Sequence, residues 1–285
     1  MYEERVLGSA MIRLLYAQSK AANLLLKHIV SSKVISVIYG HLMNSSFSRL
    51  LIRNFVKNNN INLNDSEKSI KQFKNFNDFF TRRLKQGSRE INLDNDTIIS
   101  PADGKILVYE NYQNSPNLYI KGSDYNLYTL LQDKQLAGLF ENCSIAVIRL
   151  SPIDYHRFHF PLDGFVSDTK YINGKYYSVS PIALLGKPEL YYENKRTITE
   201  FEHQKIGKLL FLEIGATLVG SIKQTHLPHS EVKKAEEKGY FEFGGSTVIL
   251  IFQKDKILFD SDILENTNKG CETVIRMGES LGKII

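Results

Sequence analysis

The chain has 285 residues, 42% hydrophobic and 24% charged, a balance that excludes a disordered chain and suits one large domain or one and a half. Its two cysteines, Cys143 and Cys271, have no metal-like spacing and are too few for a disulfide framework, which fits a reducing compartment. No apolar run reaches the roughly 18–20 residues that span a bilayer.

The first fifth of the chain holds its basic character. Residues 1–57 carry eight Lys or Arg against two Glu, a net charge of +6, whereas the whole chain has +5. Apolar residues recur there between the basic ones, which is typical of an amphipathic helix in a membrane interface. Each basic residue near an anionic surface contributes on the order of 1 kcal/mol. The alternative is a helical cap packed on the domain or on a dimer partner.

The next segments predict a change from helix to strand. Residues 57–68 are a polar, Asn-rich connector, and 77–83 follow as a predicted helix. Beyond about residue 97, short β-rich runs alternate with Gly, Pro and Asn, and we predict strands within 98–109, 145–150, 164–172, 209–222 and 240–259. The predicted fold class is α+β, an N-terminal amphipathic helical segment followed by a mostly antiparallel β body. We divide it into a helical membrane-association segment with linker, 1–68, and a β-rich domain, 69–285, for which the motifs below imply catalysis.

Two glycines interrupt the last of these predicted strands, just before a serine. Gly244 and Gly245 precede Ser246 and Thr247 within an aromatic and β-branched stretch. Glycine inside a strand marks a bulge or a close backbone approach. A serine placed there can press its hydroxyl against the preceding carbonyl and attack the chain's own peptide bond. An ordinary serine at a β-bulge is the alternative reading.

Two further segments supply partners for that hydroxyl. Residues 100–106 contain Asp103, and residues 150–161 contain His156 and His159. An acid, a base and a serine are the residue types of a nucleophilic relay, in which the base takes the serine proton and the acid orients the base. Such relays occur in different chain orders on unrelated folds. For Asp103 the alternative is a plain Pro-x-Asp-Gly turn.

Together these motifs resemble the phosphatidylserine decarboxylase family. The resemblance runs from residue 76 to residue 280 and rests on several segments in the same order: Phe76-Asn-Asp-Phe-Phe-Thr-Arg-Arg-Leu84, Pro101-Ala-Asp-Gly104, Asp154-Tyr-His-Arg-Phe-His-Phe-Pro161, Gly215-Ala-Thr-Leu-Val-Gly-Ser-Ile222, Lys238-Gly-Tyr-Phe-Glu-Phe-Gly-Gly-Ser-Thr247 and Met277-Gly-Glu-Ser280. One departure is Gly244, where many members carry leucine. That residue does not react, so the implied chemistry is unchanged.

The resemblance implies a self-processing enzyme. His159, oriented by Asp103, takes the proton of Ser246, whose oxygen attacks the carbonyl of Gly245 and divides the chain into residues 1–245 and 246–285. Ser246 becomes a pyruvoyl group, which forms a Schiff base with the amine of phosphatidylserine and releases CO2 to leave phosphatidylethanolamine. His156 serves this second stage, and neither a metal nor a separate cofactor is implied.

The spacing of the two histidines sets a condition on that assignment. Residues 156 and 159 would point to opposite faces of a regular strand. In a helical or turn conformation, side chains three residues apart lie near one another. If both imidazoles serve one site, residues 155–161 are not a regular strand, and Pro152 and Pro161 favour a loop.

The resemblance also implies partners and a location. It implies phosphatidylserine and an anionic membrane surface as partners, peripheral attachment at the cytoplasmic face of the cell membrane, no nucleic acid, and a homodimer of processed heterodimers. Two other functions stay open. One is a serine hydrolase that uses Asp103, His159 and Ser246 on an external ester and stays in one piece. The other is a non-enzymatic membrane or carrier module.

Overall fold

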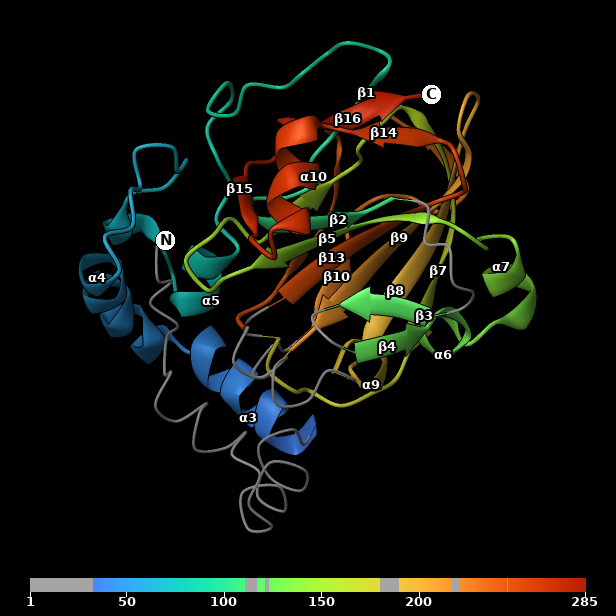
Figure 1. The fold of residues 1–285 in the computed structure, drawn as a ribbon. Coiled ribbons are helices and arrows are strands. Elements are labelled where there is room, and N and C mark those ends of the chain that lie inside the picture. Colours follow the sequence, from blue (N-terminus) through green and yellow to red (C-terminus); the bar gives the residue numbers. More distant parts are fainter. Residues whose placement is uncertain (1–32, 111–116, 121–122, 180–189, 217–220, 245) are drawn as a thin grey trace.

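A computed structural model describes residues 33–110, 117–120, 123–179, 190–216, 221–244 and 246–285 (Figure 1). Helices near the start of this part of the chain lie beside a large antiparallel sheet, with short helices and smaller sheets around it. The predicted α+β class, helices first and then a mostly antiparallel β body, is therefore confirmed. The expected helical residues 1–32 lie outside the described residues.

The helical part consists of short elements. They are α3 (Lys33–Asn44), the 3-10 turn η2 (Ser46–Ser48), α4 (Arg49–Asn58), the 3-10 turn η3 (Ile70–Gln72) and α5 (Phe76–Phe80). In the part of the chain that the structure describes, no helix is long and apolar enough to cross a bilayer. The N-cap residue Asn75 begins α5, because its side chain accepts a hydrogen bond from the backbone N–H of Asp78.

The main sheet has eight strands in the order β11-β7-β8-β9-β13-β5-β2-β15, every neighbouring pair antiparallel. In chain order these strands are β2 (Gly104–Tyr109), β5 (Ser144–Leu150), β7 (Gly164–Ile172), β8 (Arg196–His203), β9 (Gly207–Gly215), β11 (Ser230–Val232), β13 (Ser246–Phe252) and β15 (Thr273–Ile275). The central strands β5, β9 and β13 are rich in apolar residues, as expected for strands that are buried on both faces along most of their length.

Smaller elements surround this sheet. One three-stranded sheet joins β1 (Thr97–Ile99), β16 (Ser280–Ile284) and β14 (Ile257–Phe259), and another joins β10 (Ile222–Gln224), β12 (Glu237–Phe241) and β6 (Arg157–His159). A hairpin pairs β3 (Asn117–Ile120) with β4 (Ser123–Asn126). The remaining helices are α6 (Leu127–Leu131), α7 (Lys134–Gly138), α9 (Leu190–Glu193) and α10 (Ser261–Asn268), the last of which lies against β2 (Figure 1).

The helical part has its own apolar cluster, which we call the aromatic cluster. Its buried members are Met43, Ile52, Phe73, Phe76, Phe79 and Phe80, and Phe243 packs against them. Phe243 lies just before the proposed cleavage point, so the helices contact that segment directly. The cluster includes residues on both sides of position 68, and the division into 1–68 and 69–285 stays a prediction.

Candidate active site

Ser246 is the first residue of β13, and the sheet fixes its position. It pairs with Leu150 of β5 on one side and with Gly215 of β9 on the other, and its side chain is fully buried. Gly244, two residues earlier, has a φ of +141°, a conformation that residues with a Cβ rarely adopt. Gly245 lies outside the described residues. A hydroxyl on a central strand is held rigidly, as a reacting group requires.

His156 is hydrogen-bonded to this hydroxyl. Its Nδ1 lies 3.2 Å from Ser246 Oγ, and its Nε2 lies 2.9 Å from the carbonyl oxygen of Ser151. Because a carbonyl only accepts, Nε2 must carry the proton, and in the neutral ring Nδ1 is then the acceptor for the serine hydroxyl. The ring of Phe80 stacks on the imidazole at a centroid distance of 3.9 Å and fixes its plane.

Burial keeps this imidazole neutral. The side chain is fully enclosed, and burial lowers the pKa of His156 from 6.5 to about 3. At neutral pH the lone pair on Nδ1 is therefore available to the Ser246 proton. A neutral base within hydrogen-bond reach of a hydroxyl is the arrangement that general-base catalysis needs.

A tight turn holds the carbonyl that orients His156. Asp154 accepts a hydrogen bond from the Ser151 N–H at 2.6 Å and returns its own N–H to the Ser151 carbonyl at 2.9 Å. Burial raises the pKa of Asp154, while the hydrogen bonds from Ser151 lower it. Asp154 therefore orients the loop. Among the described residues, no hydrogen bond joins it to His156 or His159.

His159 has different partners. Its Nδ1 donates to the carbonyl of Ala235 at 3.0 Å, so its Nε2 accepts from the Tyr155 hydroxyl at 3.2 Å. Among the hydrogen bonds of the described residues, none joins His159 to Ser246. Residues 157–159 form the strand β6, so the loop that Pro152 and Pro161 favoured is not present there, and the two imidazoles contact different residues. The structure thus brings His156 and Ser246 together and places His159 beside Tyr155.

Asp103 lies in the turn before β2, and its carboxylate is held by Arg89. The two form a two-pronged ion pair, with Nε to Oδ1 at 3.2 Å and Nη2 to Oδ2 at 2.5 Å, and Oδ1 also accepts the N–H of Met277 at 2.9 Å. No hydrogen bond between Asp103 and a histidine occurs in the described residues. Burial lowers the pKa of His159, and the nearby charge of Asp103 acts in the opposite direction. The following Gly104 has no room for a side chain, because a Cβ would lie 2.7 Å from the Arg149 carbonyl oxygen.

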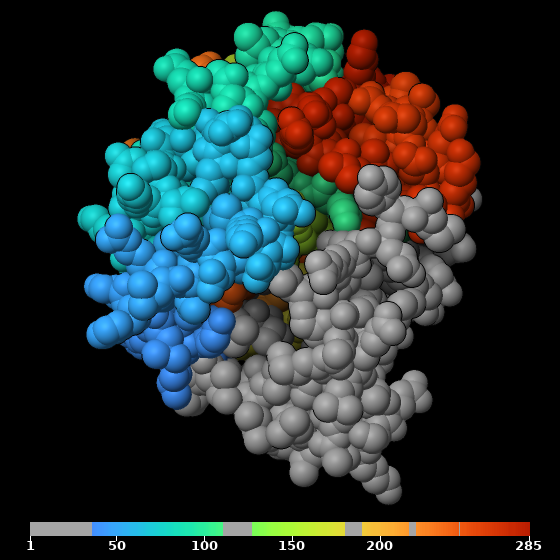
Figure 2. All heavy atoms as spheres, turned by 90° about the vertical axis from the view of Figure 1, so that its left-hand side faces the viewer, coloured from blue at the N-terminus to red at the C-terminus, as the bar shows by residue number. Residues whose placement is uncertain are grey.

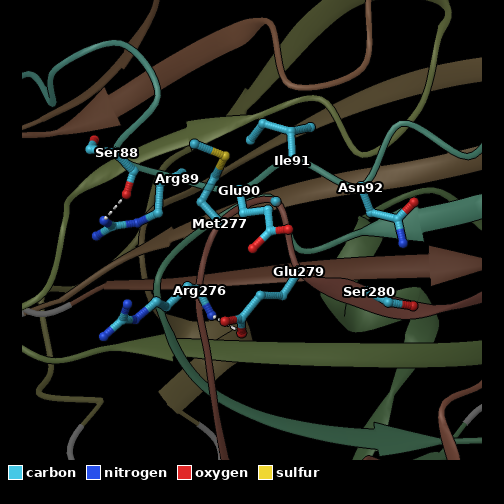
Figure 3. Close-up of a pocket in the computed structure, with 10 residues that line it drawn as sticks. Ser88, Arg89, Glu90, Ile91, Asn92, Arg276, Met277, Glu279 and Ser280 are labelled. Carbon is cyan, nitrogen blue, oxygen red and sulfur yellow. Dashed lines mark hydrogen bonds between the residues drawn. The ribbon is translucent and has the colours of Figure 1, made fainter.

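A polar cavity of about 390 Å³ is lined in part by Arg89, the partner of Asp103 (Figure 3). Its walls are residues 88–92 and 276–280. Figure 3 shows Arg89 and Arg276 extending to one side, with Glu90 and Glu279 between them and Ser280. None of the lining residues contacts Ser246 through a described hydrogen bond. Within the described residues, no group of three His, Cys, Asp or Glu side chains is arranged to hold a metal ion.

Three residues around Ser246 have roles that the motifs did not indicate. They are Phe80, which stacks on His156; Ser151, which orients it; and Asn77, whose side chain accepts the backbone N–H of Phe243 at 3.0 Å. Phe80 and Asn77 belong to the segment 76–84, which the resemblance included without a function. Their pairing with residues 156 and 243 depends on tertiary packing.

The buried imidazole makes stability depend on pH. The unfolded chain binds a proton at His156 near pH 6.5, whereas the folded chain does so only near pH 3. This contribution to stability is complete above pH 6.5 and is lost as the pH falls toward 3, by about 2 kcal/mol between pH 7 and pH 5. Urea unfolding of an uncleaved Ser246→Ala chain measures it. Adding His156→Gln should flatten this pH dependence of the free energy of unfolding. If the free energy of unfolding of the His156 variant depends on pH as before, His156 is not the buried neutral group described here.

The comparisons with known proteins agree with the motifs. The family model described as phosphatidylserine decarboxylase matches residues 76–283. A protein of Clostridium tetani named phosphatidylserine decarboxylase proenzyme is 45% identical over 98% of this chain and 94% of its own length. Proteins of the same name from Fusobacterium nucleatum and Clostridium kluyveri are 43% and 44% identical, each over 98% of this chain, covering 93% and 94% of their own lengths. The chain belongs to the phosphatidylserine decarboxylase family, a family of carboxy-lyases.

Proposed function

We propose that this chain cleaves itself between Gly245 and Ser246 and then converts phosphatidylserine to phosphatidylethanolamine and CO2. The observation that carries the proposal is the buried, neutral imidazole of His156 on the hydroxyl of Ser246. The word proenzyme in the names of the relatives supports the cleavage. Among the described residues, the strand after Ser246 argues against an external ester as substrate. Ser246 is followed by a strand, whereas the serine elbow of a hydrolase leads into a helix.

The cleavage requires no second molecule. A base removes the Ser246 proton, Oγ bonds to the carbonyl carbon of Gly245, and the peptide C–N bond breaks as the amine is protonated, which leaves an ester. Elimination across Cα–Cβ of residue 246 then releases the Gly245 carboxylate, and water replaces the nitrogen as ammonia leaves. An intramolecular attack gains several kcal/mol from positioning alone.

The proposed base is His159, with Asp103 as its partner, on the strength of the family resemblance. In the described arrangement His159 Nε2 accepts from Tyr155 and Asp103 pairs with Arg89. His159 must therefore exchange the Tyr155 hydroxyl for that of Ser246 before it acts. The direct contact at 3.2 Å makes His156 the second candidate for this step.

The surroundings of residue 246 fit a pyruvoyl group, because the group is made from the serine and occupies its enclosed position. When formed, its ketone supplies the electron sink that a decarboxylation needs. His156 would then face residue 246 with Nδ1, and this nitrogen must first take up a proton before it can pass one to a substrate bound there. Phe80 and the Ser151 carbonyl would keep the imidazole in that orientation.

Intact mass under denaturing conditions tests the proposal. We expect two pieces, residues 1–245 and 246–285, with the second lighter by one ammonia than its serine form. Release of CO2 from phosphatidylserine by the same preparation would establish the substrate. A single full-length mass, together with hydrolysis of an external ester, would replace this proposal by the serine hydrolase.

We also propose that helices α3 and α4 contact an anionic membrane surface. Six large apolar side chains are exposed there, which we call the apolar face: Val37, Ile38, Leu42, Phe47, Leu50 and Leu51. Helix α4 also carries the basic residues Arg49, Arg53 and Lys57. The helices form one flank of the molecule, blue in Figure 2. Exposed apolar residues among basic ones match the chemistry of an anionic lipid surface. From the resemblance we propose the cytoplasmic face and a homodimer of processed heterodimers.

Vesicle binding checks the apolar face. Leu50→Ser should weaken binding to vesicles containing anionic lipid by about tenfold, since a buried leucine contributes more than 1 kcal/mol. Leu93→Ser is the matched control, because both leucines are 76% exposed and Leu93 lies outside the apolar face. Raising the salt concentration should weaken binding of the unaltered chain. Equal losses for both leucine variants, or binding that salt leaves unchanged, would argue against this surface.

A further inference from the structure

The segment before the proposed cleavage point is fixed by three consecutive backbone amides. The N–H of Phe241 donates to the carbonyl of His156 at 2.9 Å, and that of Glu242 donates to the carbonyl of Ser221 at 3.0 Å. The N–H of Phe243 donates to the side-chain oxygen of Asn77 at 3.0 Å. The first two acceptors are backbone carbonyls, and the third is a side chain from the helical part of the molecule.

Asn77 itself is held on both sides. Its side chain is 8% exposed, and its Nδ2 donates to Oδ1 of Asn44 at 3.1 Å, which leaves its own Oδ1 for Phe243. Asn75, which caps α5, donates from its side chain to the carbonyl of Asn44 at 3.0 Å. The orientation of the Asn77 amide is therefore set by α3 and α5 rather than by the strand that it supports.

The half-buried side chain of Phe243 packs in the same place. Its ring lies 5.0 Å from that of Phe76 and 4.9 Å from that of Phe80, both edge to face, and 5.6 Å from that of Tyr39. Phe80 also stacks on His156. One aromatic group thus touches both the residue before the glycine pair and the imidazole beside Ser246.

We propose that Asn77 is a positioning residue for self-cleavage, a role that rests on the cleavage proposed above. Glycine has the largest conformational freedom of the residues, so a pair of glycines does little by itself to hold a chain in one conformation. The described residues on either side are anchored, Ser246 in β13 and Phe243 on Asn77. In the proposed role, the hydrogen bond from Phe243 to Asn77 holds the chain upstream of the glycine pair for attack by Ser246 Oγ.

The expected effect follows from the sensitivity of such reactions to position. A displacement of about 1 Å can slow a positioned reaction by about 10²-fold. We expect Asn77→Leu, which removes the acceptor, to slow cleavage by about 10- to 100-fold. Asn77→Asp keeps an acceptor at the same place, and Asn44 can turn its amide to donate to the new carboxylate. We expect this variant to cleave within about threefold of the unaltered rate.

The matched control is Ser48→Ala. Ser48 Oγ is buried, accepts the backbone N–H of Phe76 at 2.8 Å and lies within donating distance of the carbonyls of Met43 and Ser45. Its loss therefore removes buried hydrogen bonds in the same helical part, while Asn77 still accepts the N–H of Phe243. We expect near-normal cleavage. The full chains are made by cell-free translation with anionic vesicles, and cleavage is followed on gels. Decarboxylation is then measured per cleaved molecule.

The outcomes separate the two proposals. The positioning role is supported if Asn77→Leu cleaves slowly, Asn77→Asp recovers, and turnover per cleaved molecule is unchanged. Turnover should not change, because after cleavage Phe243 belongs to residues 1–245 and is no longer joined to residue 246. The role is overturned if Asn77→Leu cleaves normally, if Asn77→Asp is as slow as Asn77→Leu, if Ser48→Ala is as slow, or if turnover per cleaved molecule falls as much as cleavage. An unaltered chain that stays whole would instead remove the proposed function.

Discussion

Replacing Ser246 by alanine should leave a single chain of 285 residues and abolish decarboxylation. Alanine has no oxygen to attack the Gly245 carbonyl, and no ketone can form at residue 246. In a serine hydrolase, removal of the nucleophile lowers kcat by on the order of 10⁶-fold. Intact mass and CO2 release measure the two effects. Alanine is smaller than serine and adds no atom to this fully buried site, so the variant should still fold. Its melting temperature checks this.

Thr247→Val is the control for Ser246→Ala. Thr247 is the next residue of β13, equally buried, and valine keeps its shape. We expect this variant to cleave and to decarboxylate close to normally. The role given to Ser246 would be contradicted if Ser246→Ala were cleaved. It would also be contradicted if either variant stayed uncleaved and still released CO2.

The two histidine variants are expected to fail at different stages. His159→Ala should stay uncleaved, and His156→Ala should cleave but release CO2 poorly. The loss of a general acid or base lowers a rate by about 10²- to 10⁴-fold. Gels over time report cleavage, and CO2 release per cleaved molecule reports the second stage.

The opposite result has a structural explanation ready. If His156→Ala stays whole and His159→Ala cleaves, the imidazole 3.2 Å from Ser246 Oγ is the base, and the assignment by resemblance fails. Tyr155→Phe is informative in both cases. It frees His159 Nε2 from the hydroxyl that it accepts, so it should speed cleavage only if His159 is the base.

The family and fold class could be predicted because they depend on residue order. The motifs from residue 76 to residue 280 are confirmed by the family match, and the helix-to-strand change near residue 97 is confirmed by the sheets. The strand β8 was not predicted. Its Arg196, Glu200 and Glu202 read as a polar stretch, yet Arg196 is fully buried and donates to the carbonyls of Leu130 and Tyr192.

The four candidate catalytic residues could be named from the sequence, but their contacts could not. Which side chain of residues 155–159 faces Ser246 depends on where β6 begins, and a shift of one residue reverses the faces. The pairing of Asp103 with Arg89 likewise comes from a loop that meets the turn at residues 101–104 only in the folded chain. The catalytic roles of His156, His159 and Asp103 therefore stay predictions, and the histidine variants described above test the first two.

The two-sided pairing of β13 has a consequence for the life of the molecule. All seven of its residues pair with both β5 and β9, and the segment 246–285 also supplies β14, β15 and β16. Once cleaved as proposed, the two polypeptides share one hydrophobic core and stay together. Reassembly after unfolding would then need two molecules to meet, so it would depend on concentration. The Gly245–Ser246 bond would thus keep the two segments together while the precursor folds. After cleavage, the folded enzyme would be protected by a slow unfolding rate, and unfolding would be effectively irreversible.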